Sequence, residues 1–492
     1  MKQYRILILG GILAAASMLG ACSKWLDVTP KTQMKEDEQF STRQGYIDAL
    51  FGIYQRSAAD SLYGSNLSFG LVELLAGRYE NKAGTGNWYG QLARYNYTYN
   101  ATGLNVEREI GEIWATSYAC IAQSNYILRN VDNGKSLLGE QAYRIIKGES
   151  LALRAFLHFD LLRLYAPVPG AANNEQPAIP YMDAFTIMPK ERQSVAQVLS
   201  RIEAELLEAE ELLSVHTDID QIANNQNSTS SDLFLMFRQN HLNYWAVKAL
   251  LARMYLYKGD KPNALKYAQE VIGSGKFRLM TAADVLSTDP VALDSDLTLT
   301  REHIFSIYVS HLKRVSDQLF KAAVSFNDDG RDLYNTQTKI NTMFEASVPG
   351  YGTDIRLPVQ SRSFWTVVTT QGNIYTKKFH ADNERNVRQR LVPVIRLPEM
   401  YYIAAEASAN PDEGLGFLNT VRSARGLPEL ATSANLDAEI MKEYRKEFYG
   451  EGQLWYYFKR KNTATIPDGV GNPMTETKYI FPLPMDEIQF GR

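Results

Sequence analysis

Residues 78–90 combine glycine with side chains suited to binding a flat, polar ligand. Arg78 and Asn81 open the stretch, and Trp88 and Tyr89 lie near its end. Aromatic rings offer flat apolar faces, while arginine and asparagine supply hydrogen-bond donors and acceptors. A ligand with an apolar face and a polar rim could use both kinds of group, so these four residues are candidate ligand contacts. The alternative is that Trp88 anchors the loop in the protein core.

Side chains that could catalyse a reaction are present, but they form no recognisable constellation. The six histidines include no pair four residues apart, and the spacing of Gly84, Gly86 and Gly90 misses the dinucleotide-binding fingerprint by one position. The nucleophile elbow and the Walker A loop are both missing from the sequence. We therefore expect no enzyme activity, no metal and no cofactor.

The carboxylates with the most regular spacing are Glu443, Glu447 and Glu451, which recur every four residues. This spacing places them on one face of a single helix, with lysine and arginine as near neighbours. We interpret them as a solvated or ion-paired helix face. Carboxylates are numerous, so their number alone does not exclude a glycosidase pair.

The N-terminus predicts export and lipid attachment. Lys2 and Arg5 precede an uncharged apolar run at residues 6–19, which is too short to cross a bilayer. Residues 19–22, Leu-Gly-Ala-Cys, resemble a bacterial lipobox, which implies cleavage before Cys22 and acylation of that cysteine. Residues 1–21 are thus expected to be a signal peptide, and once Cys22 carries lipid, Cys120 is left without a disulfide partner.

Composition limits the class of protein. Hydrophobic residues make up 45% and charged residues 22% of the 492 residues, so a large core is possible and general disorder is excluded. Lys and Arg number 52 against 55 Asp and Glu, for a net charge of −3, which provides no basic surface for nucleic acid.

The elements that must position the candidate residues are mostly helices. Apolar residues recur every three or four positions, the period of an amphipathic helix, in residues 42–55, 107–131, 140–165, 194–213, 241–258, 262–272, 398–408, 413–425 and 436–460. Residues 300–310 are rich in β-branched and aromatic residues and predict a short strand. Residues 65–105 and 284–396 are irregular and loop-rich.

One predicted hairpin has the spacing of a tetratricopeptide unit. Ala252 and Ala264 are small enough to let two helices approach, and Leu251 and Tyr255 would fill the space between them. The alternative is an ordinary antiparallel helix pair. The sequence therefore predicts a mainly α, single compact unit, in which tetratricopeptide-like hairpins form a scaffold and an irregular half carries short strands.

Several segments resemble the SusD/RagB family of nutrient-binding outer-membrane lipoproteins. The matching segments are residues 25–30, 152–165 with 167–169, 396–399, 404–407, 418–428, 443–448, 451–455, 459–460, 481–484 and 487–488. Departures from the family pattern are Ala166 where glycine is usual, Leu454 where arginine is usual and Tyr457 where aspartate is usual. The last two put one customary polar contact in doubt. Because the segments span both ends of the chain, the resemblance covers residues 22–492.

The resemblance implies a lipid-anchored protein of the outer membrane, facing outside. It also implies a SusC-like TonB-dependent transporter as partner and an oligosaccharide or polysaccharide as ligand. In the family, ligand contacts come from the region of residues 65–105 and from the irregular middle, where Phe364 and Trp365 stand out. These two residues therefore join the candidates, although burial in the core is an alternative for Trp365.

Three other functions stay open at this point. The same location at the outer membrane suits a receptor for peptides or another nutrient. A lipid-anchored glycoside hydrolase would need two carboxylates facing one cleft. A helical-repeat scaffold that binds only other proteins would make the aromatic loops incidental.

Overall fold

The computed structural model describes residues 36–80, 88–101, 104–219, 232–285, 296–321, 332–358, 364–368, 372–382 and 386–491. The predicted signal peptide, the predicted lipidation site Cys22 and the candidate contact Asn81 lie outside these ranges.

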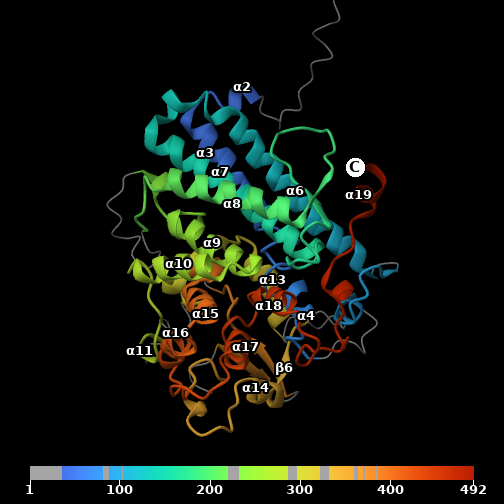
Figure 1. Ribbon diagram of the computed structural model, residues 1–492, viewed down its shortest axis with the longest axis vertical. Coiled ribbons are helices and arrows are strands. Elements are labelled where there is room, and N and C mark those ends of the chain that lie inside the picture. Colours follow the sequence, from blue (N-terminus) through green and yellow to red (C-terminus); the bar gives the residue numbers. More distant parts are fainter. Residues whose placement is uncertain are drawn as a thin grey trace, which may run out of the picture.

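Helices form most of the described chain (Figure 1). They are α2 (Glu36–Gln39), α3 (Arg43–Ser57), α4 (Leu71–Leu75), α5 (Trp88–Ala93), α6 (Val106–Val131), α7 (Lys135–Tyr165), α8 (Val195–Leu213), α9 (Tyr244–Lys258), α10 (Lys261–Gly273), α11 (Ala282–Val285), α13 (Leu312–Phe320), α14 (Gln337–Met343), α15 (Leu397–Ala407), α16 (Pro411–Ala424), α17 (Leu436–Glu447), α18 (Gln453–Arg460) and α19 (Met485–Phe490). Every predicted helix except 436–460 is confirmed, and the predicted mainly α class is confirmed with them.

The long helices stack in sequence order and form a scaffold. Helix α3 packs on α6, α6 on α7, α7 on α8 and α8 on α9, and the stack continues through α10, α15 and α16 (Figure 1). Because neighbours along the chain are neighbours in space, each antiparallel pair buries the apolar stripe of the next pair.

The predicted tetratricopeptide-like hairpin is formed by α9 and α10. Gly259 ends α9 in the left-handed conformation with φ 88°, and the Asp260 side chain caps α10 by accepting from the Asn263 N–H at 3.2 Å. Ala252 and Ala264 are fully buried between the two helices. Their small size allows the close approach that the sequence predicts.

Helix α7 is the centre of the scaffold. From Gly148 to Tyr165 every one of its side chains is buried, so the burial extends beyond a single stripe to all faces. Its polar groups find partners inside the protein: His158 Nε2 accepts from the Met182 N–H at 3.0 Å, and Arg154 donates to Glu205. Burial lowers the pKa of His158 to about 3, so this ring is neutral.

The strands are short and lie mostly in the irregular half. They are β1 (Asn100–Ala101), β2 (Leu104–Asn105), β3 (Pro177–Pro180), β4 (Arg192–Ser194), β5 (His303–Tyr308), β6 (Asn335–Thr336), β7 (Trp365–Val368), β8 (Asn373–Thr376) and β9 (Leu391–Arg396). β1 pairs with β2, β3 with β4 and β5 with β9, all antiparallel, and β6-β8-β7 form a three-stranded sheet. The strand predicted within residues 300–310 is β5.

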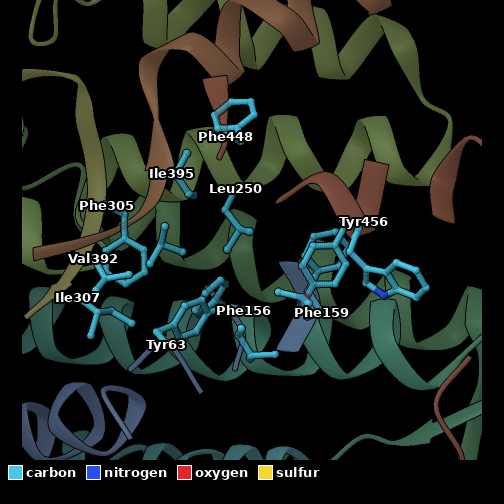
Figure 2. Close-up of a cluster of buried hydrophobic side chains, with 14 of the residues drawn as sticks. Tyr63, Phe156, Phe159, Leu250, Phe305, Ile307, Val392, Ile395, Phe448 and Tyr456 are labelled. Carbon is cyan, nitrogen blue, oxygen red and sulfur yellow. The ribbon is translucent and has the colours of Figure 1, made fainter. Parts of the chain in front are cut away.

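Strands β5 and β9 lie inside the core. Figure 2 shows Phe305 and Ile307 of β5 with Val392 and Ile395 of β9, and the Phe305 ring lies against Phe156 of α7, with ring centres 5.8 Å apart. The irregular half is thus joined to the helical scaffold by a continuous apolar core, which makes the described chain one compact unit.

The prediction of one helix over residues 436–460 is wrong. Helix α17 ends at Glu447 and α18 begins at Gln453, and between them Gly450 and Gly452 take φ values of 77° and 74°. A Cβ atom at Gly452 would lie 2.4 Å from the Leu67 carbonyl oxygen, so the turn requires glycine there.

Among the helices of the described chain, none combines the length with the apolar character that crossing a bilayer requires. Cys120 is a buried free thiol whose pKa burial raises to about 11.

Candidate ligand-binding site

Arg78 lies in the interior, between the segment that follows α4 and the C-terminal helices. Its Nε lies 3.5 Å from Glu73 Oε2, its guanidinium carbon lies 4.7 Å from the centre of the Tyr449 ring, and one Nη donates to the Arg445 carbonyl. Only 3% of Arg78 is exposed. These contacts make it a link between distant segments in this structure.

Glu73 explains why the chain around Arg78 is fixed. It is fully buried, and its two carboxylate oxygens accept from the Gly450 and Gly452 N–H groups at 2.9 Å each. Burial raises the pKa of Glu73 to about 7 despite the positive charge of Arg78. The turn between α17 and α18 is therefore held by a side chain more than 370 residues away in the sequence.

Phe364 and Trp365 are also buried. The Trp365 Nε1 donates to the Arg356 carbonyl oxygen at 2.7 Å, and its ring lies 4.7 Å from that of Tyr449. Both residues line a cavity of about 30 Å³, and Lys378 lines it as well. The structure thus brings Arg78 and Trp365 to the same ring, Tyr449, but inside the protein.

Trp88 and Tyr89 form the first turn of α5. Their ring centres are 4.1 Å apart, Tyr89 is 4% exposed, and Trp88 is half-buried against the core. Among the candidates that the structure describes, Trp88 is the one with an appreciable part of its side chain accessible. It is consequently the candidate whose placement agrees best with ligand stacking.

A polar and aromatic surface that the sequence did not reveal lies beside Arg78. We call it the β6–β8 ledge: Glu80, Asp332, Tyr334, Lys339 and Asn373. The Glu80 N–H donates to the Tyr334 carbonyl at 2.8 Å, and the Glu80 carboxylate lies 3.2 Å from Lys339 Nζ. All five side chains are partly exposed, and Asp332 also accepts from the buried Tyr375 hydroxyl at 2.8 Å.

The β6–β8 ledge has the chemistry expected for a sugar. Tyr334 supplies a partly exposed aromatic ring on which the Asp332 and Glu80 charges act, and Lys339 and Asn373 add an ammonium group and an amide to the same ledge. The only signal in the sequence was the mixed polar and aromatic composition of residues 284–396. The pairing of residue 80 with residue 334 depends on the tertiary fold.

A larger groove lies between α6 and α19. Its volume is about 620 Å³, within the range of small-ligand sites. Trp114 and Phe490 provide aromatic surface, and Arg108, Glu112 and Glu487 provide charge. None of the six predicted contact residues lines this groove.

The regularly spaced carboxylates Glu443, Glu447 and Glu451 lie in a buried ion network. The alternative of a solvated face is wrong, because each is at most 3% exposed, and Glu451 lies beyond the end of α17. Glu447 accepts from Arg396 at 2.7 Å and from Arg425 at 2.7 Å. Burial acts to raise the pKa of Glu447, but the Arg425 and Arg396 guanidinium groups hold it well below the usual range. These groups serve to fix the fold.

In the part of the chain that the structure covers, histidine, cysteine and carboxylate side chains do not gather into a group of three that could hold a metal ion.

Comparison with known proteins places the chain in a family. A family model described as "Starch-binding associating with outer membrane" matches residues 24–256, and a model described as "SusD family" matches residues 321–489. The chain belongs to the SusD/RagB family. The resemblance seen in the sequence is thereby confirmed.

Relatives of this SusD/RagB chain match it nearly end to end. The SusD-like protein P38 of Formosa agariphila is 22% identical over 549 residues, which covers 98% of this chain and 97% of that protein. A SusD superfamily protein from Bacteroides thetaiotaomicron aligns with a TM-score of 0.69 at 18% identity, covering 92% of this chain and 97% of that one. A laminarin-binding SusD-like protein aligns with a TM-score of 0.64 at 19% identity, covering 92% and 98%. At these identities the structural comparisons establish a shared fold.

Proposed function

We propose that this protein binds an oligosaccharide or polysaccharide at the cell surface and delivers it to a SusC-like TonB-dependent transporter. The observation that carries the proposal is the match of the two family models, one of which is described as starch-binding, to most of the chain. The laminarin-binding and carbohydrate-binding proteins that share the fold support the same ligand class.

The described surfaces agree with a sugar ligand. The β6–β8 ledge combines the partly exposed Tyr334 ring with polar side chains, and Trp88 offers a partly accessible indole in a neighbouring sequence segment. Arg78, Asn81, Tyr89, Phe364 and Trp365 remain part of the proposal, with the buried ones positioning the loops. The position of Asn81 lies outside the described residues.

We propose that the protein is held to the outer membrane, facing outside, by lipid on Cys22. The Leu-Gly-Ala-Cys sequence and the family description "associating with outer membrane" support this anchor. We further propose that it has no catalytic activity, since the buried carboxylates of the C-terminal helices are paired with arginine or lysine.

The experiment is a binding screen of the mature chain against glycan and peptide arrays, followed by calorimetric titration with the best ligand. Glycan binding that weakens in both Trp88→Ala and Tyr334→Ala would support the proposed ligand and surface. Phe51→Ala is a matched control, since Phe51 is an exposed aromatic residue on α3. Binding to peptides alone would overturn the carbohydrate proposal in favour of a peptide receptor.

A further inference from the structure

The α6–α19 groove is bordered by the most exposed apolar side chains of the described chain. Pro189 lines the groove from the loop between β3 and β4, and Phe490 lines it from α19. Six large hydrophobic residues of the described chain are more than half exposed, and five of them lie on these two segments: Ile187, Met188, Met485, Ile488 and Phe490. We call these five residues the apolar rim. Apolar side chains gathered on a surface in this way mark a contact with another molecule.

The loop that carries Ile187 and Met188 is held on α6. Asn125 of α6 donates to the Met182 carbonyl at 2.8 Å, and the Phe185 ring lies 5.1 Å from the Tyr126 ring, also on α6. This part of the rim is therefore fixed in place before any partner binds, which lowers the entropic cost of binding.

The floor of the groove is aromatic and equally fixed. Trp114 lines it, and its ring centre lies 4.9 Å from that of Tyr118 and 4.8 Å from that of Tyr165. With the rim above it, this ring makes the groove an apolar receptacle of about 620 Å³.

Carboxylates outnumber cations along the groove. Glu112, Asp486 and Glu487 line it together with Arg108. Arg108 is shared between two carboxylates, because its Nε lies 3.7 Å from Glu112 Oε1 and its Nη2 lies 3.2 Å from Glu109 Oε1. The charges that line the groove sum to −2, so they favour a partner with positive charge.

The two carboxylates of α19 are available to such a partner. Neither Asp486 nor Glu487 forms an ion pair with another described residue. Burial raises the pKa of Glu487, and the charge of Arg192 offsets this effect only in part. A cation placed beside Glu487 would compensate the loss of solvent around its carboxylate.

The groove lies on the side of the molecule where the described chain begins. Glu36 accepts from Arg129 at 2.5 Å, and the Arg129 guanidinium carbon lies 4.6 Å from the ring centre of Phe185, on the loop of the apolar rim. Helices α2, α6 and α19 all lie in the upper half of Figure 1. Glu36 follows Cys22 by 14 residues, which span at most about 46 Å. With Cys22 acylated as proposed above, this side of the molecule is tethered near the membrane.

The chemistry of the surface distinguishes between possible occupants. A sugar gains little from isoleucine and methionine side chains, which offer neither a flat ring nor a hydrogen-bonding group. An anionic membrane surface would be repelled by the carboxylates. A protein segment with apolar and basic side chains satisfies both the rim and the charge.

We propose that the α6–α19 groove and its apolar rim receive a segment of the transporter in which an apolar side chain neighbours a lysine or arginine. The apolar side chain packs over Trp114, and the cation lies beside Asp486 and Glu487. This inference rests on the proposed function, and it assigns the surface through which the partner is held.

Affinity measurements test the apolar part of the proposal. The full chain is titrated against the SusC-like transporter encoded nearest to its gene, with both proteins in detergent. The double variant Ile488→Ser, Phe490→Ser should raise Kd about 10-fold or more, because it removes two exposed apolar anchors. Leu233→Ser is the matched control, since Leu233 is the sixth residue that is more than half exposed and it does not line the groove. Equal affinity of the rim variant and the wild type would overturn the proposal.

The dependence of binding on salt tests the charged part. Wild-type binding should weaken as sodium chloride is raised, and Asp486→Lys with Glu487→Lys should raise Kd about 10-fold at low salt and abolish that weakening. Asp412→Lys with Glu413→Lys reverses two exposed carboxylates on α16 and should leave both Kd and its salt dependence unchanged. Melting temperatures of all variants show whether they fold. An equal effect of the two charge reversals would contradict a site at α19.

Cross-linking identifies the occupant directly. A benzophenone amino acid replaces Phe490, the intact complex is irradiated, and the cross-linked peptide is sequenced by mass spectrometry. We expect a transporter peptide with a lysine or arginine close to the cross-linked residue, and no such product when the probe replaces Leu233. Cross-links only to lipid or glycan, in a complex that forms normally, would overturn this inference and leave the proposed function intact. A wild type that binds no transporter would overturn the proposed delivery function, and this docking site with it.

Discussion

At the scale of single residues, burial separates the candidate contacts into two groups. Arg78, Tyr89, Phe364 and Trp365 are all at least nine-tenths buried, and Trp88 is half-buried. A ligand that stacks on an indole needs the ring face to be accessible, so the structure favours Trp88 over Trp365 for this task. The two tryptophans therefore give opposite expectations on substitution.

We expect Trp88→Ala to weaken binding of the best glycan while the melting temperature stays close to that of the wild type. By analogy with base–aromatic stacking, loss of one aromatic ring that stacks on the ligand costs ~1–3 kcal/mol, or roughly 5- to 150-fold in affinity. Calorimetric titration and thermal melts measure the two effects. A mutant that binds as tightly as the wild type, or that melts far lower, would show that Trp88 serves packing instead.

Trp365→Ala is the contrasting substitution. It removes a buried ring and the hydrogen bond to the Arg356 carbonyl, so we expect a loss of ~3–5 kcal/mol in the free energy of unfolding. Denaturant titration measures this free energy of unfolding. A loss below about 1 kcal/mol would mean that the ring is not part of the core.

At the scale of elements, the junction of α15 with α18 depends on a buried ion pair. Glu406 accepts from both Nη atoms of Arg460, at 2.6 and 2.7 Å, and lies 2.9 Å from Lys461 Nζ. Burial opposes ionisation of Glu406, yet the hydrogen bonds and charge of Arg460 lower its pKa to about 2. Because this value is below that of the unfolded chain, the ionised pair stabilises the fold above about pH 4.5.

This stabilisation should be lost as the pH falls from about 4.5 to about 2. A shift of that size corresponds to about 3 kcal/mol at 1.36 kcal/mol per unit. Denaturant titrations at a series of pH values would show a shallower acid loss in Glu406→Gln than in the wild type. If stability fell equally with pH in the two proteins, Glu406 would not be the cause of the acid loss.

The ion network around Glu447 links α17 to β9 and α16. Glu447→Gln keeps the size of the side chain but leaves Arg396 and Arg425 short of negative charge inside the protein. We expect a loss of ~3–5 kcal/mol in the free energy of unfolding, measured by denaturant titration. Glu429→Gln, at an exposed position, should change it by less than ~0.5 kcal/mol, and a similar change in both variants would contradict the role of the network.

The helices could be predicted from the sequence because amphipathic periodicity is local. The same signal failed at residues 436–460, because the apolar pattern continues through Phe448. The helix breaks at Gly450 and Gly452, whose N–H groups donate to Glu73, a residue distant in the sequence. The irregular half gave no periodic pattern, so the sequence left open whether Trp365 is buried in the core or contacts a ligand. The β6–β8 ledge was missed for a related reason, since Glu80 and Tyr334 meet only in the folded chain.

At the scale of the whole molecule, the proposed attachment to a membrane depends on the N-terminus. We expect Cys22→Ala to fold normally but to appear in the soluble fraction or to retain its signal peptide, because the lipobox motif provides the acylated residue. Detergent fractionation and the mass of the N-terminus test this. An intact Met1 on the mature wild type would disprove the lipoprotein proposal.

We also expect no hydrolysis of any glycan that the protein binds. The carboxylates of the ion network are engaged by arginine and lysine, which leaves them unsuited to act as a general acid. Incubation at high protein concentration with chromatographic analysis of products is the measurement. Products that disappear when Glu112 or Glu487 of the α6–α19 groove is changed to Gln would identify a hydrolase.

The burial of α7 on all faces has a consequence for the order in which the chain folds. The end of α7 is completed by residues from the far end of the sequence: Lys459 donates to the Arg163 and Ala166 carbonyls, and the Phe481 N–H donates to the Leu164 carbonyl at 3.0 Å. During synthesis, α7 therefore keeps uncovered apolar surface until almost the whole chain has left the ribosome. On the export route proposed above, such a delay keeps the core from closing before translocation across the membrane is nearly finished.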